Sequence, residues 1–301
     1  MTLWRGLALV FGLMAGVPAC RQTPEAKAAQ LRELEQARAK QLAKRLAKAD
    51  ANPDKNQPVA SWIMPAELRE ISGLTLLPNG HLLAHDDEVA RIYDIDPKSG
   101  VIIKSFTLDN ARHGDFEGIT TVGSDIYLLE SNGKLYRFKD GSADKEVPYS
   151  VYDTHLGKEC EFEGIAYDAD SSSLLLACKH VKSKNLDHQL VIYRLKMPLA
   201  DSAEYSMLTI PLGEVIGENK WKHFHPSDLA IDPATGNYVV IASKEQGLAV
   251  ITPDGDVVRS EPLPKGHSQA EGVAITRDSL LVISDEVTHK AADITLYRWR
   301  Q

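Results

Sequence analysis

A five-residue phrase occurs five times in this chain, and its spacing restricts the fold more than any other feature. Its third residue is Glu or Ser, and its fourth is glycine in four of the five copies. The fourth position falls at 73, 118, 164, 228 and 272, so successive copies lie 45, 46, 64 and 44 residues apart. A period in the forties is typical of a repeat fold such as a propeller or a helical array. The copies are Glu70-Ile-Ser-Gly-Leu74, Asp115-Phe-Glu-Gly-Ile119, Glu161-Phe-Glu-Gly-Ile165, His225-Pro-Ser-Asp-Leu229 and Gln269-Ala-Glu-Gly-Val273.

The residues between the phrases have the pattern of β-strands. Short apolar runs alternate with turn pairs such as Asn79-Gly80, and no helical period persists beyond residue 59. Each repeat holds four such runs, which is the plan of a propeller blade. The last repeat holds only three, and the segment from Ala60 to Met64 supplies the missing outer strand. The sequence therefore predicts an all-β fold, a five-bladed β-propeller over residues 59–301.

The 64-residue step leaves six blades as the alternative. It contains a long hairpin and an insert from Gly213 to Phe224, which we interpret as a loop over one face of the propeller. A sixth blade needs about forty further residues, so five blades are favoured.

Residues 1–20 have the pattern of a signal peptide. Arg5 precedes an apolar run that ends in small residues and Cys20, and this run is too short for a permanent membrane span. Cys20 is placed like the acylated first residue of a bacterial lipoprotein, although Val17 and Pro18 depart from the usual pattern. Cleavage after Ala19 without acylation is the alternative. We expect an exported protein of the bacterial cell envelope, anchored to the membrane by a lipid on Cys20, with the propeller in the periplasm or at the cell surface.

Residues 21–58 are predicted to form a helical or flexible spacer. Thr23-Pro24-Glu25 is a helix start, and residues 26–49 favour helix. This spacer holds nine Lys and Arg against five Asp and Glu, a net charge of +4. The whole chain has a net charge of −8, so subtracting the spacer and Arg5 leaves −13 for residues 59–301. An acidic propeller argues against binding to nucleic acid.

We expect a monomer whose partner is an unknown small ligand or envelope protein.

Six carboxylates are predicted to surround one mouth of the central channel. The phrase begins the innermost strand of each blade, and the second strand of each blade ends at the same face. Like charges so close together require raised pKa values or a bound cation, and Ca²⁺ is the cation that prefers an all-oxygen site. The alternative is that these carboxylates only cap turns. The predicted metal ligands are Glu117, Glu163, Glu271, Asp86, Glu130 and Asp285.

Other side chains at this mouth have a different charge. Lys179 and Lys244 stand where other repeats have acidic residues, and the fourth phrase contributes His225 and Asp228. These four residues are predicted to bind the anionic group of a ligand beside the metal. The alternative is that the lysines pair with neighbouring carboxylates.

Cys160 and Cys178 are predicted to lie at one edge of a hairpin that turns at Asp170 to Ser172. In an oxidising compartment they are expected to form a disulfide, and two reduced, packed thiols are the alternative.

The phrases Asp115-Phe-Glu-Gly-Ile119 and Glu161-Phe-Glu-Gly-Ile165 resemble those of the SdiA-regulated family of bacterial envelope proteins, over roughly residues 59–299. They also look like phrases of esterase-like phytase propellers. The first resemblance implies a calcium-associated propeller with no settled activity, and the second implies phosphoester hydrolysis. The chain departs from both at Ser227-Asp228, and it lacks the Arg and Lys clusters expected for a polyphosphorylated substrate.

Two hypotheses follow. The first is a lipid-anchored propeller that binds a divalent cation and presents that face to a ligand or partner, with no catalysis. The second is a calcium-dependent hydrolase of phosphoesters or lactones. Its metal-bound water would lie at Glu117, Glu163 and Asp285, with His225 or His267 as the base.

Overall fold

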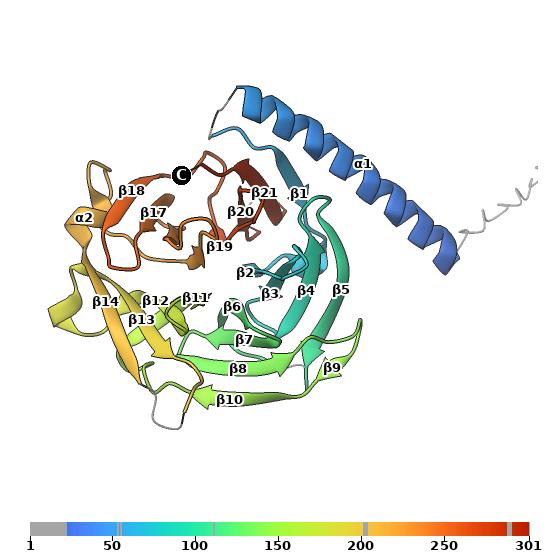
Figure 1. Ribbon diagram of the computed structural model, residues 1–301. Coiled ribbons are helices and arrows are strands. Elements are labelled where there is room, and N and C mark those ends of the chain that lie inside the picture. The colour runs from blue at the N-terminus through green and yellow to red at the C-terminus, as the bar shows by residue number, and fades with distance from the viewer. Residues whose placement is uncertain are drawn as a thin grey trace, which may run out of the picture.

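The computed structural model describes residues 23–52, 54, 56–110, 112–200, 204–287 and 291–300. The predicted signal peptide and Cys20 lie outside these residues. Five antiparallel sheets form a ring around a central channel, so the predicted five-bladed β-propeller is confirmed (Figure 1). The innermost strands of the five sheets contact one another around the ring and complete it.

Each blade runs from an inner strand to an outer one. The first contains β2 (Ile71–Leu76), β3 (Leu82–Asp86), β4 (Arg91–Asp96) and β5 (Val101–Leu108), with the short β9 (Glu146–Val147) added in parallel. The second contains β6 (Phe116–Val122), β7 (Asp125–Glu130), β8 (Lys134–Lys139) and β10 (Tyr149–Asp153). The third contains β11 (Cys160–Asp168), β12 (Ser173–Val181), β13 (Gln189–Lys196) and β14 (Tyr205–Pro211). The fourth contains β15 (Asp228–Ile231), β16 (Tyr238–Ala242), β17 (Gly247–Ile251) and β18 (Val257–Pro262).

The fifth blade closes the ring with strands from both ends of the propeller. It contains β19 (Ala270–Ile275), β20 (Leu280–Asp285) and β21 (Asp293–Arg298), and β1 (Ala60–Ile63) is its outer strand. Ala60 pairs with Leu296, and Trp62 pairs with Ile294. The predicted closure is therefore confirmed.

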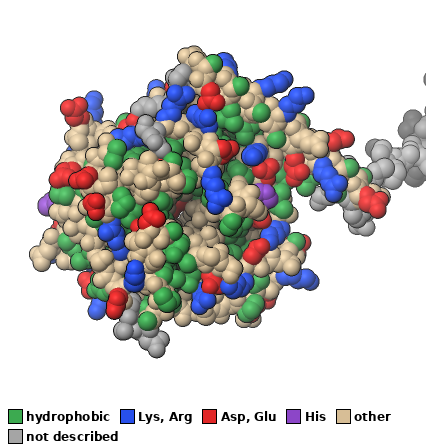
Figure 2. Space-filling model, in the orientation of Figure 1, with side chains coloured by type: hydrophobic (Ala, Val, Ile, Leu, Met, Phe, Trp, Pro, Cys, Tyr) green, Lys and Arg blue, Asp and Glu red, His purple; other side chains and the backbone are tan. Residues whose placement is uncertain are grey.

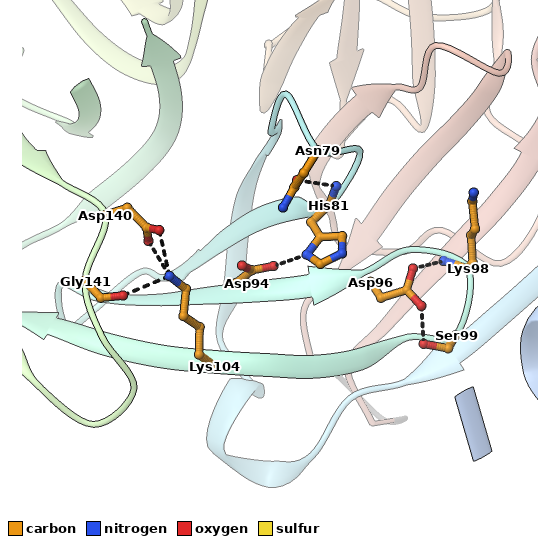
Figure 3. Close-up of polar contacts among 9 residues, drawn as sticks. All are labelled: Asn79, His81, Asp94, Asp96, Lys98, Ser99, Lys104, Asp140 and Gly141. Atoms are coloured by element: carbon orange, nitrogen blue, oxygen red, sulfur yellow. Dashed lines mark hydrogen bonds and ion pairs between the residues drawn. The ribbon is translucent and has the colours of Figure 1, made fainter. Parts of the chain in front are cut away.

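Short-range hydrogen bonds fix the turns at the outer part of the first blade (Figure 3). Asn79 Oδ1 accepts from the His81 backbone N–H at 2.9 Å, and Asp96 accepts from the Lys98 N–H at 3.0 Å and the Ser99 hydroxyl at 2.6 Å. Lys104 on β5 donates to Asp140 at 2.7 Å and so ties this blade to the loop after β8. Asn and Asp favour such turns because their side chains accept from the backbone two residues on.

The insert between the third and fourth blades fills a seam and does not cover a face. The short helix α2 (Leu212–Ile216) buries Leu212 and Val215, and Phe224 is 3% exposed in the same apolar cluster. The prediction of a loop over one face is corrected by this packing. The apolar side chains of the insert are buried in the seam between the two sheets because removing apolar surface from water is favourable in free energy.

The predicted spacer is the helix α1 (Pro24–Ala51), capped by the Thr23 hydroxyl, which accepts from the Ala26 N–H at 3.2 Å. Its second half packs on the propeller, where Leu42 is 3% exposed and Leu46 joins the cluster beneath the first and fifth blades. Arg38 donates to the Ser99 carbonyl at 2.7 Å. The first half extends beyond the propeller (Figure 1). The helix is therefore a docked element over half of its length.

The phrase glycines lie where the five inner strands approach the channel axis most closely. A Cβ on Gly118 would lie 2.9 Å from the Ile165 nitrogen, and one on Gly164 would lie 2.8 Å from the Asp228 Cα. Real Cβ atoms do not tolerate such distances to backbone. Glycine is used here for close approach of backbones.

Asp228 takes the glycine position in the fourth phrase, and its carboxylate fills the channel axis. It is 1% exposed. Its oxygens accept from the backbone N–H groups of Leu229 at 2.8 Å, Val273 at 2.8 Å and Leu74 at 3.4 Å. These donors belong to three different blades, so Asp228 links inner strands at the centre of the ring. Burial raises its pKa well above the ordinary value.

Cys160 and Cys178 form a disulfide between β11 and β12, with their Cα atoms 5.8 Å apart. The bond closes a loop of 18 residues. We predict that replacing both cysteines by Ala lowers the free energy of unfolding by about 3 kcal/mol, because the unfolded chain regains the entropy of that loop. Urea unfolding under oxidising conditions measures the change. Equal unfolding midpoints for the two proteins would contradict this prediction.

Candidate functional site

The three phrase glutamates reach the channel mouth because each is the extra residue of a β-bulge. On β6, Phe116 pairs with Glu130 and Gly118 pairs with Leu129, so Glu117 has no partner on β7. The same irregularity leaves Glu163 unpaired on β11 and Glu271 unpaired on β19. A bulge turns a side chain away from the ordinary alternation of a strand. Three blades therefore direct a carboxylate to the same mouth by the same device.

These glutamates line a cavity of about 210 Å³ at the start of the inner strands. Six carboxylates and a single lysine are among its lining residues, and Ile71, Ser72 and Gln269 complete the lining. We call this cavity the acidic mouth, and its charged residues are Glu70, Asp87, Glu117, Glu163, Lys179, Glu271 and Glu286. Of the six predicted metal ligands, three lie here.

Lys179 is the cation of the acidic mouth. Its Nζ donates to Glu163 Oε1 at 2.7 Å, and its side chain remains 33% exposed. Burial opposes its charge, but the charges of Glu163, Glu117 and Glu271 together raise the pKa of Lys179. This ammonium neutralises one carboxylate, and Arg69, outside the cavity lining, pairs with Glu70 at 2.7 Å. The other four acidic groups of the mouth have no ion pair with a described Lys or Arg side chain.

Burial, with a smaller contribution from the remaining negative charge, raises the pKa values of the glutamates in the mouth. Burial raises the pKa of Glu117 to about 10, and the charges of Glu163 and Asp115 add to this effect. Burial also raises the pKa of Glu163 to about 7, although pairing with Lys179 lowers it. The pKa of Glu271 is raised by burial as well. A bound cation would favour the ionised form of these groups.

Glu70, Asp87 and Glu286 form the rim of the acidic mouth. Burial and the neighbouring Glu70 raise the pKa of Glu286 to about 8. Burial and the charges of Asp86 and Glu70 raise the pKa of Asp87 to about 6. Asp87 Oδ1 is buried and has no hydrogen-bond partner among the described residues. The rim therefore contains an oxygen with an unused capacity to bind a donor or a cation.

The other three predicted ligands do not line the acidic mouth. Asp86 Oδ1 accepts from the N–H groups of Glu88 and Val89 and holds a turn. Glu130 accepts from the Tyr136 hydroxyl at 2.7 Å, and Asp285 pairs with His267. Cross-strand partners point to the same side of a sheet. Glu130 pairs with Phe116, and Asp285 pairs with Ala270. Phe116 and Ala270 are buried between blades, so the carboxylates of Glu130 and Asp285 also point between blades and not into the mouth.

The predicted ligand-binding residues are only partly brought together. Lys179 is in the mouth, whereas Asp228 is buried in the axis beneath it and is not open to a ligand. His225 donates to or accepts from Glu245 Oε1 at 2.7 Å, and its ring lies beside those of His180 and His223. Lys244 is exposed and does not line the cavity.

The residues named for hydrolysis are separated. Asp285 and His267 are 6% and 3% exposed and face Tyr297 within a seam, away from Glu117 and Glu163 in the mouth. Within the described residues, no three His, Cys, Asp or Glu side chains are already arranged around a common metal position. No helix in the described part of the chain is long and apolar enough to span a membrane.

The fold and the mouth define a class: a five-bladed β-propeller with an acidic channel entrance. Residues 220–299 match the family model described as SdiA-regulated, which is the family that the sequence resembles; the phrases at 115–119 and 161–165 lie outside this matched segment. A search of curated protein sequences finds no match to this chain.

The similar solved structures are distant in sequence. The PQQ-bound aldose sugar dehydrogenase of Streptomyces coelicolor is 14% identical, with 79% of this chain and 98% of that chain covered and a TM-score of 0.51. Glutaminyl cyclase of Myxococcus xanthus is 14% identical, with 79% and 96% covered and a TM-score of 0.50. Virginiamycin B lyase of Staphylococcus aureus is 16% identical, with 78% and 68% covered and a TM-score of 0.42. At 14% identity, the similarity to the first two structures concerns the fold alone.

Proposed function

We propose that the acidic mouth binds a divalent cation, calcium in the first instance, and presents that face of the propeller to a ligand or partner. The observation that carries this proposal is the surplus of carboxylates, six against one lysine, around a cavity of about 210 Å³. The bulged glutamates supply only oxygen donors, which suits a hard cation with tolerant geometry. No catalytic role is assigned to this site.

The residues present would hold a calcium ion after Lys179 turns aside and the glutamates converge, since no three described His, Cys, Asp or Glu side chains yet surround a common metal position. Glu117, Glu163 and Glu271 would be the ligands from the inner strands, and Asp87 would offer its unpartnered Oδ1 from the rim. Lys179 now pairs with Glu163, and its part-exposed side chain is free to turn toward solvent. The lysine is thus an internal competitor of the cation.

Calorimetric titration of calcium into the purified chain tests the proposal. We predict one binding event that is lost in the double variant Glu117→Gln plus Glu271→Gln. Each substitution replaces a carboxylate ligand with a neutral amide and keeps the shape of the side chain. Lys179→Met is expected to bind calcium about tenfold more tightly, since it removes the competing charge. The matched control is Asp254→Asn plus Glu214→Gln, which removes two carboxylates outside the mouth and should bind as the unchanged chain does. Absence of calcium binding in the unchanged chain would refute the proposal.

We also propose export and acylation at Cys20, on the basis of the sequence pattern. In a bacterial host that is fed labelled palmitate, the chain is expected to carry the label and to sediment with membranes. Cys20→Ser should lose both properties. A labelled Cys20→Ser protein, or an unlabelled parent chain, would contradict this prediction.

A further inference from the structure

The channel has a second cavity at its other end, beyond the glycine constriction. Its volume is about 340 Å³, and it is lined by the later residues of all five inner strands, for example Leu76, Tyr167 and Ile275. Figure 2 shows a hollow at the centre of the propeller with hydrophobic side chains around it. The phrase positions and Asp228 close the axis between the two cavities. We call this second cavity the apolar funnel.

The funnel differs chemically from the acidic mouth. Most of its lining residues are aliphatic, and its hydroxyl groups belong to Thr75, Thr120, Thr121 and Tyr167. None of these four hydroxyl groups has a hydrogen-bond partner among the described residues. Small-molecule sites are typically concave and mostly apolar, with a few polar groups that orient the ligand, and they begin at volumes of roughly 300 Å³. The apolar funnel has aliphatic side chains on all five inner strands, but polar atoms form a larger share of its surface than in such sites, and its volume lies at the lower end of that size range.

Arg277 carries the single charge of the funnel lining. It is exposed, and its guanidinium donates a long hydrogen bond of 3.4 Å to the Pro78 carbonyl. Four carboxylates follow lining residues in the chain: Asp170 is exposed next to Ala169, and the other three have partners elsewhere. Asp232 accepts from Trp299, Asp168 accepts from Tyr238 and Ser171, and the exposed Asp278 accepts from Thr276. The guanidinium of Arg277 is therefore available to an anion at the rim.

We propose that the apolar funnel binds a small amphiphilic anion, with its apolar body between the inner strands and its single anionic head on Arg277. Charge selects this end of the channel, because the same anion is repelled by the carboxylates of the acidic mouth. Such a ligand buries apolar surface and keeps its charge at the rim, next to water. This site is independent of the proposed cation site, since the closed axis separates them.

Titration of the full chain with octanoate and with the neutral 1-octanol tests the assignment. We expect one octanoate per chain. Arg277→Gln should weaken octanoate binding about tenfold and leave octanol binding unchanged, because only the acid uses the guanidinium. Arg277→Lys should restore most of the loss. Thr121→Trp, which fills the funnel, should abolish the binding of both ligands.

The matched control is Lys265→Gln, which removes an exposed positive charge outside the funnel and should bind octanoate as the unchanged chain does. Glu117→Gln plus Glu271→Gln should also leave octanoate binding unchanged, which separates this test from that of the cation site. The proposal is overturned if the unchanged chain binds no octanoate, if Arg277→Gln weakens acid and alcohol equally, or if Thr121→Trp still binds both.

Discussion

Glu117→Gln is expected to raise the free energy of unfolding by about 3 kcal/mol at pH 7 in the presence of a chelator. The pKa of Glu117 rises from an ordinary 4.5 to about 10 in the folded chain, so folding at pH 7 requires it to take up a proton. Each pH unit above 4.5 costs about 1.4 kcal/mol until the folded pKa is reached. Gln keeps the neutral shape and removes this cost.

The sign of the pH dependence follows from the same shift. A carboxyl group with a raised folded pKa costs no stability below pH 4.5, and the stability of the fold falls as the pH rises from there toward about 10. Glu163, Asp87 and Glu286 act in the same direction, with pKa values of about 7, 6 and 8. We therefore expect the urea concentration at the unfolding midpoint of the unchanged chain to decrease as the pH is raised from 5 to 9.

Urea unfolding of both proteins across this pH range measures the effect. The difference between Glu117→Gln and the unchanged chain should vanish near pH 4.5 and grow as the pH rises, and calcium should stabilise only the unchanged chain. Asp254→Asn, in an exposed turn, is the control and should show no such pH-dependent difference. A Glu117→Gln protein that is less stable at pH 7 would contradict the electrostatic account of the acidic mouth.

Gly164→Ala is expected to lower the free energy of unfolding by more than about 3 kcal/mol. The added Cβ would lie 2.8 Å from the Asp228 Cα and 2.9 Å from the Leu229 nitrogen, both of which are backbone atoms at the channel axis. The backbone there cannot move without separating inner strands, and overpacking a rigid core costs 1 to 3 kcal/mol or more. Loss of the Asp228 hydrogen bonds would add to this cost.

The matched control for this prediction is Gly213→Ala in α2. A Cβ at Gly213 meets no atom within 4 Å, and the position is helical, so Ala should be neutral or stabilise the chain by up to about 1 kcal/mol. Thermal unfolding of the two variants gives the comparison. If Gly164→Ala were as stable as Gly213→Ala, the phrase glycines would not be required for close approach of the inner strands.

The repeat phrase was sufficient to predict the fold because it records a packing constraint that every blade shares. Its glycine marks the point where inner strands meet at the axis, and its spacing gives the blade length. The closure by Ala60 to Ile63 followed from counting strands, since an edge without a partner exposes unpaired backbone groups. The docking of α1 did not follow, because Leu42 and Leu46 give only a thin apolar stripe, and its partner surface exists only after the blades have assembled.

The site was predicted only in part because side-chain direction depends on single-residue register. Glu117, Glu163 and Glu271 lie in the mouth, whereas Asp86, Glu130 and Asp285 were each chosen at a strand end. In the first and fifth blades the next residue, Asp87 or Glu286, is the one that reaches the mouth. A shift of one residue moves a side chain to the other side of a strand, and nothing local in the sequence marks a bulge.

Asp228 shows a different limit of the sequence. It looked like a ligand-binding residue because it is an acidic residue in a phrase, yet it replaces the glycine and not the glutamate of the other copies. That position faces the axis, where its carboxylate accepts backbone N–H groups from three blades. The alignment of the five copies contained this signal, because position four is the one at which no other copy has a side chain.

Anomalous diffraction from crystals soaked in terbium, a luminescent substitute for calcium, would test the central claim most directly. If the mouth binds calcium, a terbium peak is expected inside it, among Glu117, Glu163 and Glu271, with the Lys179 side chain turned away from Glu163. A peak in Glu117→Gln plus Glu271→Gln crystals at the same place, or no peak in the mouth of the unchanged chain, would contradict it.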